Sequence, residues 1–270
     1  MTLRAYSFVF IVFLSSTFSF TQLTIKEADF NSKTVLSKIF HGEFQDDNNV
    51  QKWPVSSVQA LELNSYVDDN NFSYTSVDTI INLNVDTTNY KIVVFATFQV
   101  DSSGSIQDCM GCPPLIGLAS FSKIENEFEL SCFNLNLIQQ GHGWFIPFSR
   151  IEQIGPDKYA LVFKEEIVQD WGVETWFELF KEGFPLFLTY DYTVYIPSEN
   201  SCIVENSIEI VKTENDYYDL IVQSKKIPTE IIGTDKAAKI KPLMTKLSPS
   251  LNDKILRVQI PFGYSIQPNK

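Results

Sequence analysis

The stretch YKIVVFATFQV, residues 90–100, decides the fold class of this chain. It is long, apolar and rich in β-branched and aromatic residues, and its apolar positions do not follow a helical spacing. The turn-forming run DSSGS, residues 101–105, follows it directly. An apolar run that ends in a turn signal predicts a β-strand.

Similar runs continue on both sides of the hairpin signal Gly155-Pro156-Asp157-Lys158. Short, turn-bearing connections join about eight of them, and strands do not alternate with helices. The sequence therefore predicts a mainly β fold, an antiparallel meander closed as a sandwich or barrel-like sheet. In the run at 127–138 the alternation slips near Cys132, which predicts a bulge or burial on both faces. The predicted strands cover residues 90–100, 115–123, 127–138, 151–153, 159–163, 173–181, 184–196, 207–212, 217–226 and 255–262.

Residues 22–54 are predicted to form a short helix and a loop that precede the strands. Val35, Leu36, Ile39 and Phe40 share one helical face, Asn31 or Ser32 is the expected cap, and His41-Gly42 the expected end. Residues 234–270 are less regular, with one helical turn near 237–240 before the last strand. We expect residues 22–270 to form a single β-rich domain.

Residues 1–21 have the layout of a secretory signal peptide. Arg4 precedes an apolar run from Ala5 to Leu14, and small polar residues lead to an expected cleavage site after Thr21. The alternative is a membrane anchor, but this run is shorter than the roughly 20 residues that a spanning helix needs. The sequence predicts an exported protein, periplasmic or extracellular, without a transmembrane segment in the mature chain.

The chain is acidic, with a formal net charge of -12. Nucleic acid binding requires a basic surface that releases counterions, so the composition excludes it. An anionic membrane surface is a poor target for the same reason. The expected partner is a protein, a glycan or a small molecule.

Four cysteines in an exported chain are expected to form disulfides. The candidates are Cys109, Cys112, Cys132 and Cys202, and the sequence leaves all three pairings open. A thiol-redox role for Cys109 and Cys112 would need a helix directly after the pair to lower a thiol pKa, but Pro113-Pro114 and a predicted strand follow.

A metal site is the other alternative for this motif. Cys109 and Cys112 would form half of a zinc site, which Cys132 and Cys202, or His142, would have to complete. His142 could also act as a base, whereas the structural interpretation is that Gly141-His142-Gly143 bends the chain and Trp144 packs. No cofactor is predicted, with zinc as the alternative.

Carboxylates are plentiful. The run Asp-Asp-Asn-Asn occurs at 46–49 and 68–71, where it favours turns over calcium loops because neither copy continues into the calcium-loop pattern. A glycosidase would need two facing carboxylates, but solvated surface charge is the simpler interpretation. An aromatic run could line a sugar or lipid groove or fill a β core. The carboxylates are Glu165, Glu166, Asp170, Glu174 and Glu178, and the aromatic residues are Trp171, Trp176, Phe177, Phe180 and Phe184.

The order of several small motifs resembles an uncharacterised group of bacterial secreted or periplasmic proteins. Residues 109–121 follow the pattern C-x-x-C-x-P-x-I-G-x-A-x-F, which Cys109, Cys112, Pro114, Ile116 and Gly117 match, as does Gly143. The resemblance covers residues 109–225, through the motifs at 154–158, 200–202 and 217–220. Members of the group often carry His at the second motif position, where this chain has Met110. The resemblance implies a compartment but no activity.

We therefore expect an exported binding or structural module stabilised by disulfides. A thiol-redox or metal-binding site at Cys109 and Cys112 is the first alternative, and a secreted hydrolase with paired carboxylates is the second. The sequence assigns no catalytic residue and favours a non-enzymatic role.

Overall fold

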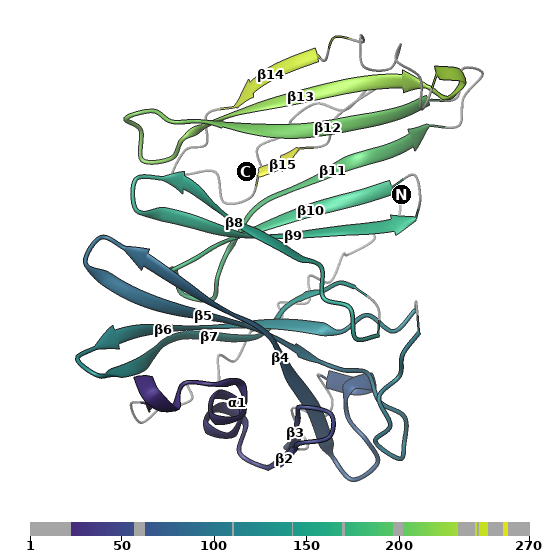
Figure 1. Cartoon of the computed structure of the whole chain (residues 1–270). Helices are drawn as coiled ribbons and strands as arrows, with labels where there is room; N and C mark the ends of the chain where they lie inside the picture. The colour runs from purple at the N-terminus through teal and green to yellow at the C-terminus, as the bar shows by residue number, and fades with distance from the viewer. Residues whose placement is uncertain are drawn as a thin grey trace, which may run out of the picture.

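The chain folds into two antiparallel sheets, which confirms the predicted mainly β class (Figure 1). The computed structural model describes residues 23–56, 63–109, 111–141, 143–168, 171–196, 202–231, 241, 243–247 and 256–258. The predicted signal peptide, the predicted helical turn near 237–240 and His142 lie outside the described residues.

The first sheet has seven strands in the order β1-β7-β6-β5-β4-β3-β2. Neighbouring strands pair antiparallel throughout. The bounds are β1 Thr24–Lys26, β2 Glu43–Gln45, β3 Val50–Pro54, β4 Phe72–Val85, β5 Thr88–Thr97, β6 Leu115–Ile124 and β7 Glu127–Gln139.

The second sheet has eight strands, of which seven follow the order β14-β13-β12-β11-β10-β9-β8. The eighth, β15, pairs parallel with β11. The bounds are β8 Phe148–Gly155, β9 Lys158–Val168, β10 Trp171–Glu178, β11 Leu186–Ile196, β12 Cys202–Val211, β13 Asp219–Pro228, β14 Leu243–Leu247 and β15 Leu256–Val258. Three single-turn helices, η1 Glu27–Asp29, η2 Asn64–Tyr66 and η3 Thr229–Ile231, lie between strands.

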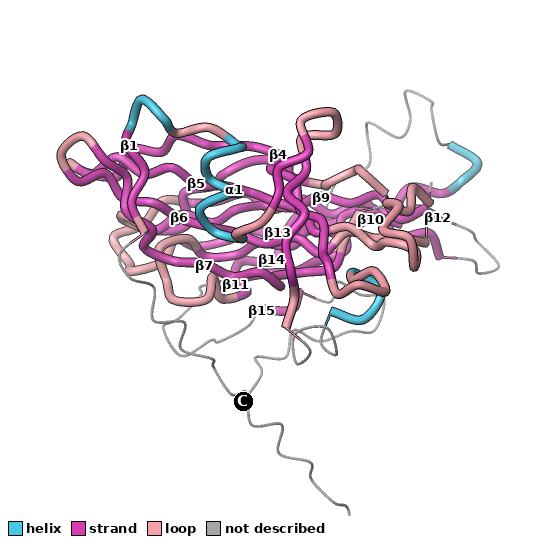
Figure 2. The backbone as a smooth tube through the Cα atoms, turned by 90° about the horizontal axis from the view of Figure 1, so that it is seen from below, coloured by secondary structure: helices cyan, strands magenta, loops and turns pink. Residues whose placement is uncertain are grey.

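The single α-helix of the described residues, α1 (Ser32–Phe40), forms where the sequence predicts it. The side chain of Asn31 caps it by accepting a hydrogen bond from Thr34 N at 3.0 Å. The helix ends at His41, where φ is 40°. Its buried residues Val35, Leu36 and Phe40 pack on the first sheet, and Figure 2 shows α1 lying across the strands.

Strand β5 is the shared wall between two cores. Because side chains alternate along a strand, Val93 and Phe95 pack with the α1 cluster. Ile92 and Val94 instead pack with residues of the second sheet, among them Phe163. The two sheets therefore bury apolar side chains against each other, as in a β-sandwich.

Two local predictions are confirmed in detail. Ser120 pairs with Cys132 while Phe121 pairs with Leu130, so Ser131 is an extra residue and forms a bulge, one of the two alternatives predicted near Cys132. The predicted hairpin joins β8, which ends at Gly155, to β9, which begins at Lys158.

The sequence interpretation missed part of the first sheet. The segment 22–54 contains the predicted helix and also contributes β1, β2 and β3. These strands are only three to five residues long, too short for a clear alternation. Strand β4 was also missed, because polar residues interrupt its apolar positions. Among the described residues, no helix is long and apolar enough to cross a membrane.

Candidate functional site

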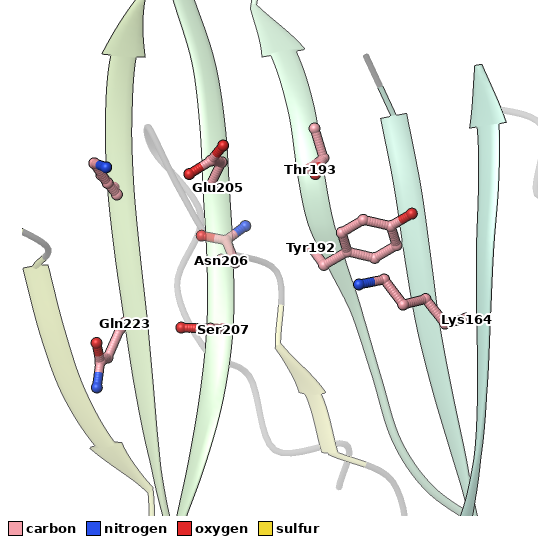
Figure 3. A pocket seen from close by; sticks show the side chains of 8 residues that line it. Lys164, Tyr192, Thr193, Glu205, Asn206, Ser207 and Gln223 are labelled. Atoms are coloured by element: carbon pink, nitrogen blue, oxygen red, sulfur yellow. The ribbon is translucent and has the colours of Figure 1, made fainter. Parts of the chain in front are cut away.

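The second sheet opens between β11 and β12. These strands pair only where Thr193–Ile196 face Cys202–Glu205. Earlier in β11, residues 188–190 pair with β15 instead. The two strands diverge below Thr193 and Glu205, as Figure 3 shows. A pocket with a volume of about 410 Å³ lies at this fork; it is lined by Lys164, Tyr192, Thr193, Glu205, Asn206, Ser207, Gln223 and Lys225. We call it the fork pocket.

Asn206 occupies the fork itself. Its Nδ2 donates a hydrogen bond to the backbone carbonyl oxygen of Asp191 at 2.6 Å, which bridges the two strands where their ladder has ended. A carbonyl oxygen only accepts, so the amide nitrogen must face Asp191 and the position of Oδ1 is fixed. The residue is only 7% exposed, and its Oδ1 has no hydrogen-bond partner in the described part of the chain. An unsatisfied buried acceptor costs about 1–3 kcal/mol.

Lys164 and Tyr192 form the wall contributed by β9 and β11 (Figure 3). The ring of Tyr192 lies against Gly172 of β10, where any Cβ would overlap the ring. Lys164 Nζ is 4.2 Å from the ring centroid. Burial first, then the charges of Glu166, Glu174 and Glu165, raise the pKa of Tyr192, so its phenol stays protonated and can donate a hydrogen bond.

Glu205 and Lys225 lie on the opposite wall. They face each other across the β12–β13 ladder, yet no ion pair joins them within the described ranges. Ser207 and Gln223 are the next opposed pair on this wall. The pocket lining thus carries two ammonium groups, one carboxylate and several neutral polar groups.

A buried ionic cluster supports the pocket from the side of β8, β10 and β11. Glu174 accepts two hydrogen bonds from Arg150, at 3.2 and 3.0 Å, and its Oε2 also accepts from Trp176 Nε1 at 3.2 Å and from Tyr190 Oη at 2.9 Å. Arg150 Nε donates to Glu152 at 2.6 Å. These five residues are called the Glu174 cluster. Lys164 Nζ, in the pocket wall, lies 3.9 Å from Glu174 Oε1 and so links the two.

The Glu174 carboxylate stays ionised. Burial raises its pKa, but the hydrogen bonds and charge of Arg150, with the hydrogen bonds from Tyr190 and Trp176, outweigh burial and hold the pKa below the ordinary value. The pKa of Tyr190 is raised, first by burial and then by the charge of Glu174. The cluster therefore links three strands through a network in which Glu174 is ionised and Tyr190 is protonated near neutral pH.

The interpretation of Glu174 and Glu178 as solvated surface charges is wrong, because they are only 4% and 5% exposed. Glu178 accepts hydrogen bonds from Tyr217 Oη at 2.9 Å and from Lys181 Nζ at 2.7 Å. Four residues along a strand span roughly 13 Å, and each carboxylate has its own cation. The two groups therefore do not form the acid-base pair of a glycosidase.

Several of the remaining acidic and aromatic candidates contribute to the fold. Glu165 accepts a hydrogen bond from Gly141 N at 2.8 Å. Asp68, in the second Asp-Asp-Asn-Asn run, is buried and accepts from the backbone N of Asn70 and Phe72 and from Tyr74 Oη, so it caps a turn. Trp176, Phe177 and Phe184 lie in the cores. Asp170 lies outside the described residues.

One disulfide joins Cys109 and Cys112, which closes the turn before β6. Cys132 in β7 and Cys202 in β12 are free thiols in different sheets, so the second disulfide that the even count allowed is not formed. Cys132 is half-buried, burial raises its pKa, and Cys202 is buried.

The loop that carries His142 lies against the disulfide turn, because Gly143 N donates a hydrogen bond to the Cys112 carbonyl at 3.0 Å. His142 itself is outside the described residues. Within the described residues, no group of three or more His, Cys, Asp or Glu side chains could hold a metal ion.

Sequence reasoning did not select Lys164, Tyr192 or Asn206. Each is an ordinary strand residue, and their convergence depends on where β11 and β12 stop pairing. The register in which two distant segments pair cannot be predicted from the residues of either segment alone.

Comparisons with protein-family models, with curated proteins and with solved structures found no match. The fold and the pocket define a mainly β protein of two packed sheets with a polar pocket at the fork of one sheet. The relation to the bacterial group with the C-x-x-C-x-P-x-I-G motif stays a prediction from the sequence.

Proposed function

We propose that this protein is an exported binding module and that a small polar ligand binds in the fork pocket. The observation that carries the proposal is the fork pocket itself, about 410 Å³ in volume, whose lining residues all carry polar or charged side chains. A small polar ligand can form hydrogen bonds with the exposed side chains of this lining, among them Glu205 and Ser207.

The architecture of the pocket supports a binding role. Its walls are strands, and the Glu174 cluster ties β8, β10 and β11 together beside it. Such support holds binding groups in place before the ligand arrives, which lowers the entropic cost of binding. A volume of about 410 Å³ lies in the lower part of the range of small-molecule sites.

The disulfide fits a structural role better than a redox role. It is followed by strand β6, so no helix dipole lowers the pKa of a thiol in this turn. A closed loop this short contributes roughly 2 kcal/mol in the chain-entropy model. We therefore infer that the disulfide Cys109–Cys112 stabilises one turn of the binding module.

Export rests on the predicted signal peptide and agrees with the presence of a disulfide. Cell fractionation followed by N-terminal sequencing tests it. We expect the protein outside the cytoplasm with Gln22 as its first residue, and a cytoplasmic protein that retains residues 1–21 would contradict export.

The binding role is tested by thermal unfolding in a panel of monosaccharides, amino acids and hydroxy acids. A ligand that binds only the folded state raises Tm. We expect at least one compound to raise Tm of the wild type and to lose this effect in Asn206→Leu. Asn89→Leu, an exposed site in the first sheet, is the matched control. If no compound raises Tm, or if Asn206→Leu responds like the wild type, the proposal is wrong.

A further inference from the structure

We propose that Asn71 is the acceptor of an N-linked glycan, which is attached while the chain is exported and before it folds. The inference goes beyond ligand binding in the fork pocket and rests on one part of the proposed function, export. It follows from the motif at residues 71–73, from the exposed turn that presents Asn71, and from the buried position of Ser73.

The motif is Asn71-Phe72-Ser73. It has the pattern Asn-x-Ser, with a residue other than proline in the middle, which is typical of acceptor asparagines in exported proteins. It is the only Asn-x-Ser or Asn-x-Thr stretch in the sequence. In this pattern the asparagine amide carries the sugar, and the hydroxyl two positions later distinguishes an acceptor from other asparagines.

The fold presents Asn71 at the end of a turn that precedes β4. Its backbone N donates a hydrogen bond to the Asp68 carbonyl at 3.0 Å, and its φ of 60° lies in the left-handed region that asparagine tolerates. Asn71 is exposed, and its side chain makes no hydrogen bond to any other described residue. A glycan on Nδ2 would therefore break no hydrogen bond of the described fold.

The first Asp-Asp-Asn-Asn run provides a natural comparison. Its last residue, Asn49, is also exposed and has a φ of 53°, so the backbone alone explains why asparagine occurs at the end of both runs. Gln51 stands two positions after Asn49, whereas Ser73 stands two positions after Asn71. We therefore expect a glycan on Asn71 and none on Asn49.

The position of Ser73 sets the order of events. Ser73 lies in β4 and is 0% exposed, and its Oγ donates a hydrogen bond to the Tyr66 carbonyl at 2.7 Å. A transferase that recognises this hydroxyl cannot reach it in the folded protein. The sugar must therefore be transferred to the unfolded chain during export.

The transfer requires a lipid-linked oligosaccharide as the donor and an oligosaccharyltransferase of the export pathway as the catalyst. Asn71 Nδ2 attacks the anomeric carbon of the first sugar and forms the N–C bond, while the C–O bond to the lipid pyrophosphate breaks. The lipid pyrophosphate leaves with the bonding electron pair, and one proton of Nδ2 is released. Nothing is oxidised or reduced.

Mass spectrometry of the protein purified from its natural source tests the inference. We expect the mass to exceed that of residues 22–270 by a whole number of sugar residues, and the peptide that contains Asn71 to carry this excess. Asn71→Asp, which tolerates the same turn, should lose the excess, and so should Ser73→Ala, which keeps the asparagine. Asn49→Asp is the matched control and should keep the excess.

Pulse labelling in the same cells tests the order of events. We expect the glycosylated form to appear within the pulse, and molecules that have folded without a glycan to gain none during the chase. Circular dichroism of the purified variants establishes that they are folded. Addition of the glycan during the chase would overturn transfer before folding.

The outcomes separate this inference from the proposed function. An exported protein without sugar on Asn71, a glycan on Asn49, or a glycan that persists in Ser73→Ala overturns the inference and leaves export and the fork pocket standing. A protein that stays in the cytoplasm with residues 1–21 attached overturns both the inference and export.

Discussion

At the scale of single residues, buried polar groups divide into those that are satisfied and those that are not. Glu174 is satisfied, with donors from Arg150, Trp176 and Tyr190. Asn206 is half satisfied, with its nitrogen bound and its oxygen unpaired. Natural cores rarely leave buried polar atoms unpaired, so the bridge that Asn206 makes between β11 and β12 has a cost, whereas Glu174 supports its strands with all its hydrogen bonds made.

Glu174→Gln should lower the free energy of unfolding by about 2–3 kcal/mol. The change leaves Arg150 without its buried counter-charge, and the loss is smaller than for a fully buried pair because Arg150 is about a third exposed. Urea unfolding at neutral pH measures it. Glu152→Gln, which removes the more exposed partner of the same arginine, should cost less than 1 kcal/mol. Equal losses in the two variants would contradict the assigned role of Glu174.

The same carboxylate should make stability depend on acid. Its pKa in the folded state lies below the ordinary value of 4.5. A depressed folded pKa means that the stabilisation is present above the unfolded pKa and is lost as the pH falls through the folded pKa. Unfolding free energies measured from pH 7 to pH 3 should therefore fall less steeply below about pH 4.5 in Glu174→Gln than in the wild type. Identical slopes would show that Glu174 is not held ionised by the fold.

At the scale of elements, the sequence predicts what is local. The helix, its Asn31 cap, the bulge at Ser131 and the Gly155–Lys158 hairpin all depend on residues within a few positions. The sequence did not predict strand β4, because polar residues interrupt its apolar positions. The sequence did not predict the fork of β11 and β12, because the fork depends on how distant segments pair with one another. The fold class was therefore accessible from the sequence, and the candidate site was not.

Gly172→Ala tests how an element shapes the pocket. A Cβ at this position of β10 would overlap the Tyr192 ring. The ring must move, so we expect a loss of about 1–3 kcal/mol in the free energy of unfolding, as for overpacked sites, together with weaker ligand binding. Denaturant unfolding and calorimetry measure the two effects. Gly111→Ala is the matched control, since no atom lies near its Cβ position. Wild-type binding by Gly172→Ala would show that the position of Tyr192 is unimportant.

At the scale of the whole molecule, two sheets share one apolar interface and each has a further core on its other face. Strand β5 supplies the wall of the first sheet, and α1 covers the face of that sheet directed away from the interface. The pocket lies in the second sheet, at the fork of β11 and β12. We expect these cores to provide most of the stability, because the disulfide Cys109–Cys112 closes only one turn.

Counting thiols checks this distribution. In denaturant without reductant, mass spectrometry after alkylation should show two modified cysteines, Cys132 and Cys202, and four after reduction. Reduction of the native protein should lower its stability by only roughly 2 kcal/mol, because the disulfide closes a short loop. Four protected cysteines, or unfolding on reduction, would mean that disulfides hold the fold.

The central claim is that a ligand binds at the fork of β11 and β12. The most direct measurement is a nuclear magnetic resonance titration of the ¹⁵N-labelled protein with the polar compound that raises Tm most. The account predicts that the backbone signals of Tyr192, Thr193, Asn206 and Ser207 and the side-chain amide signals of Asn206 shift together with one Kd, while signals of the first sheet stay in place. Shifts confined to other parts of the molecule, with the signals of the fork unchanged, would contradict it.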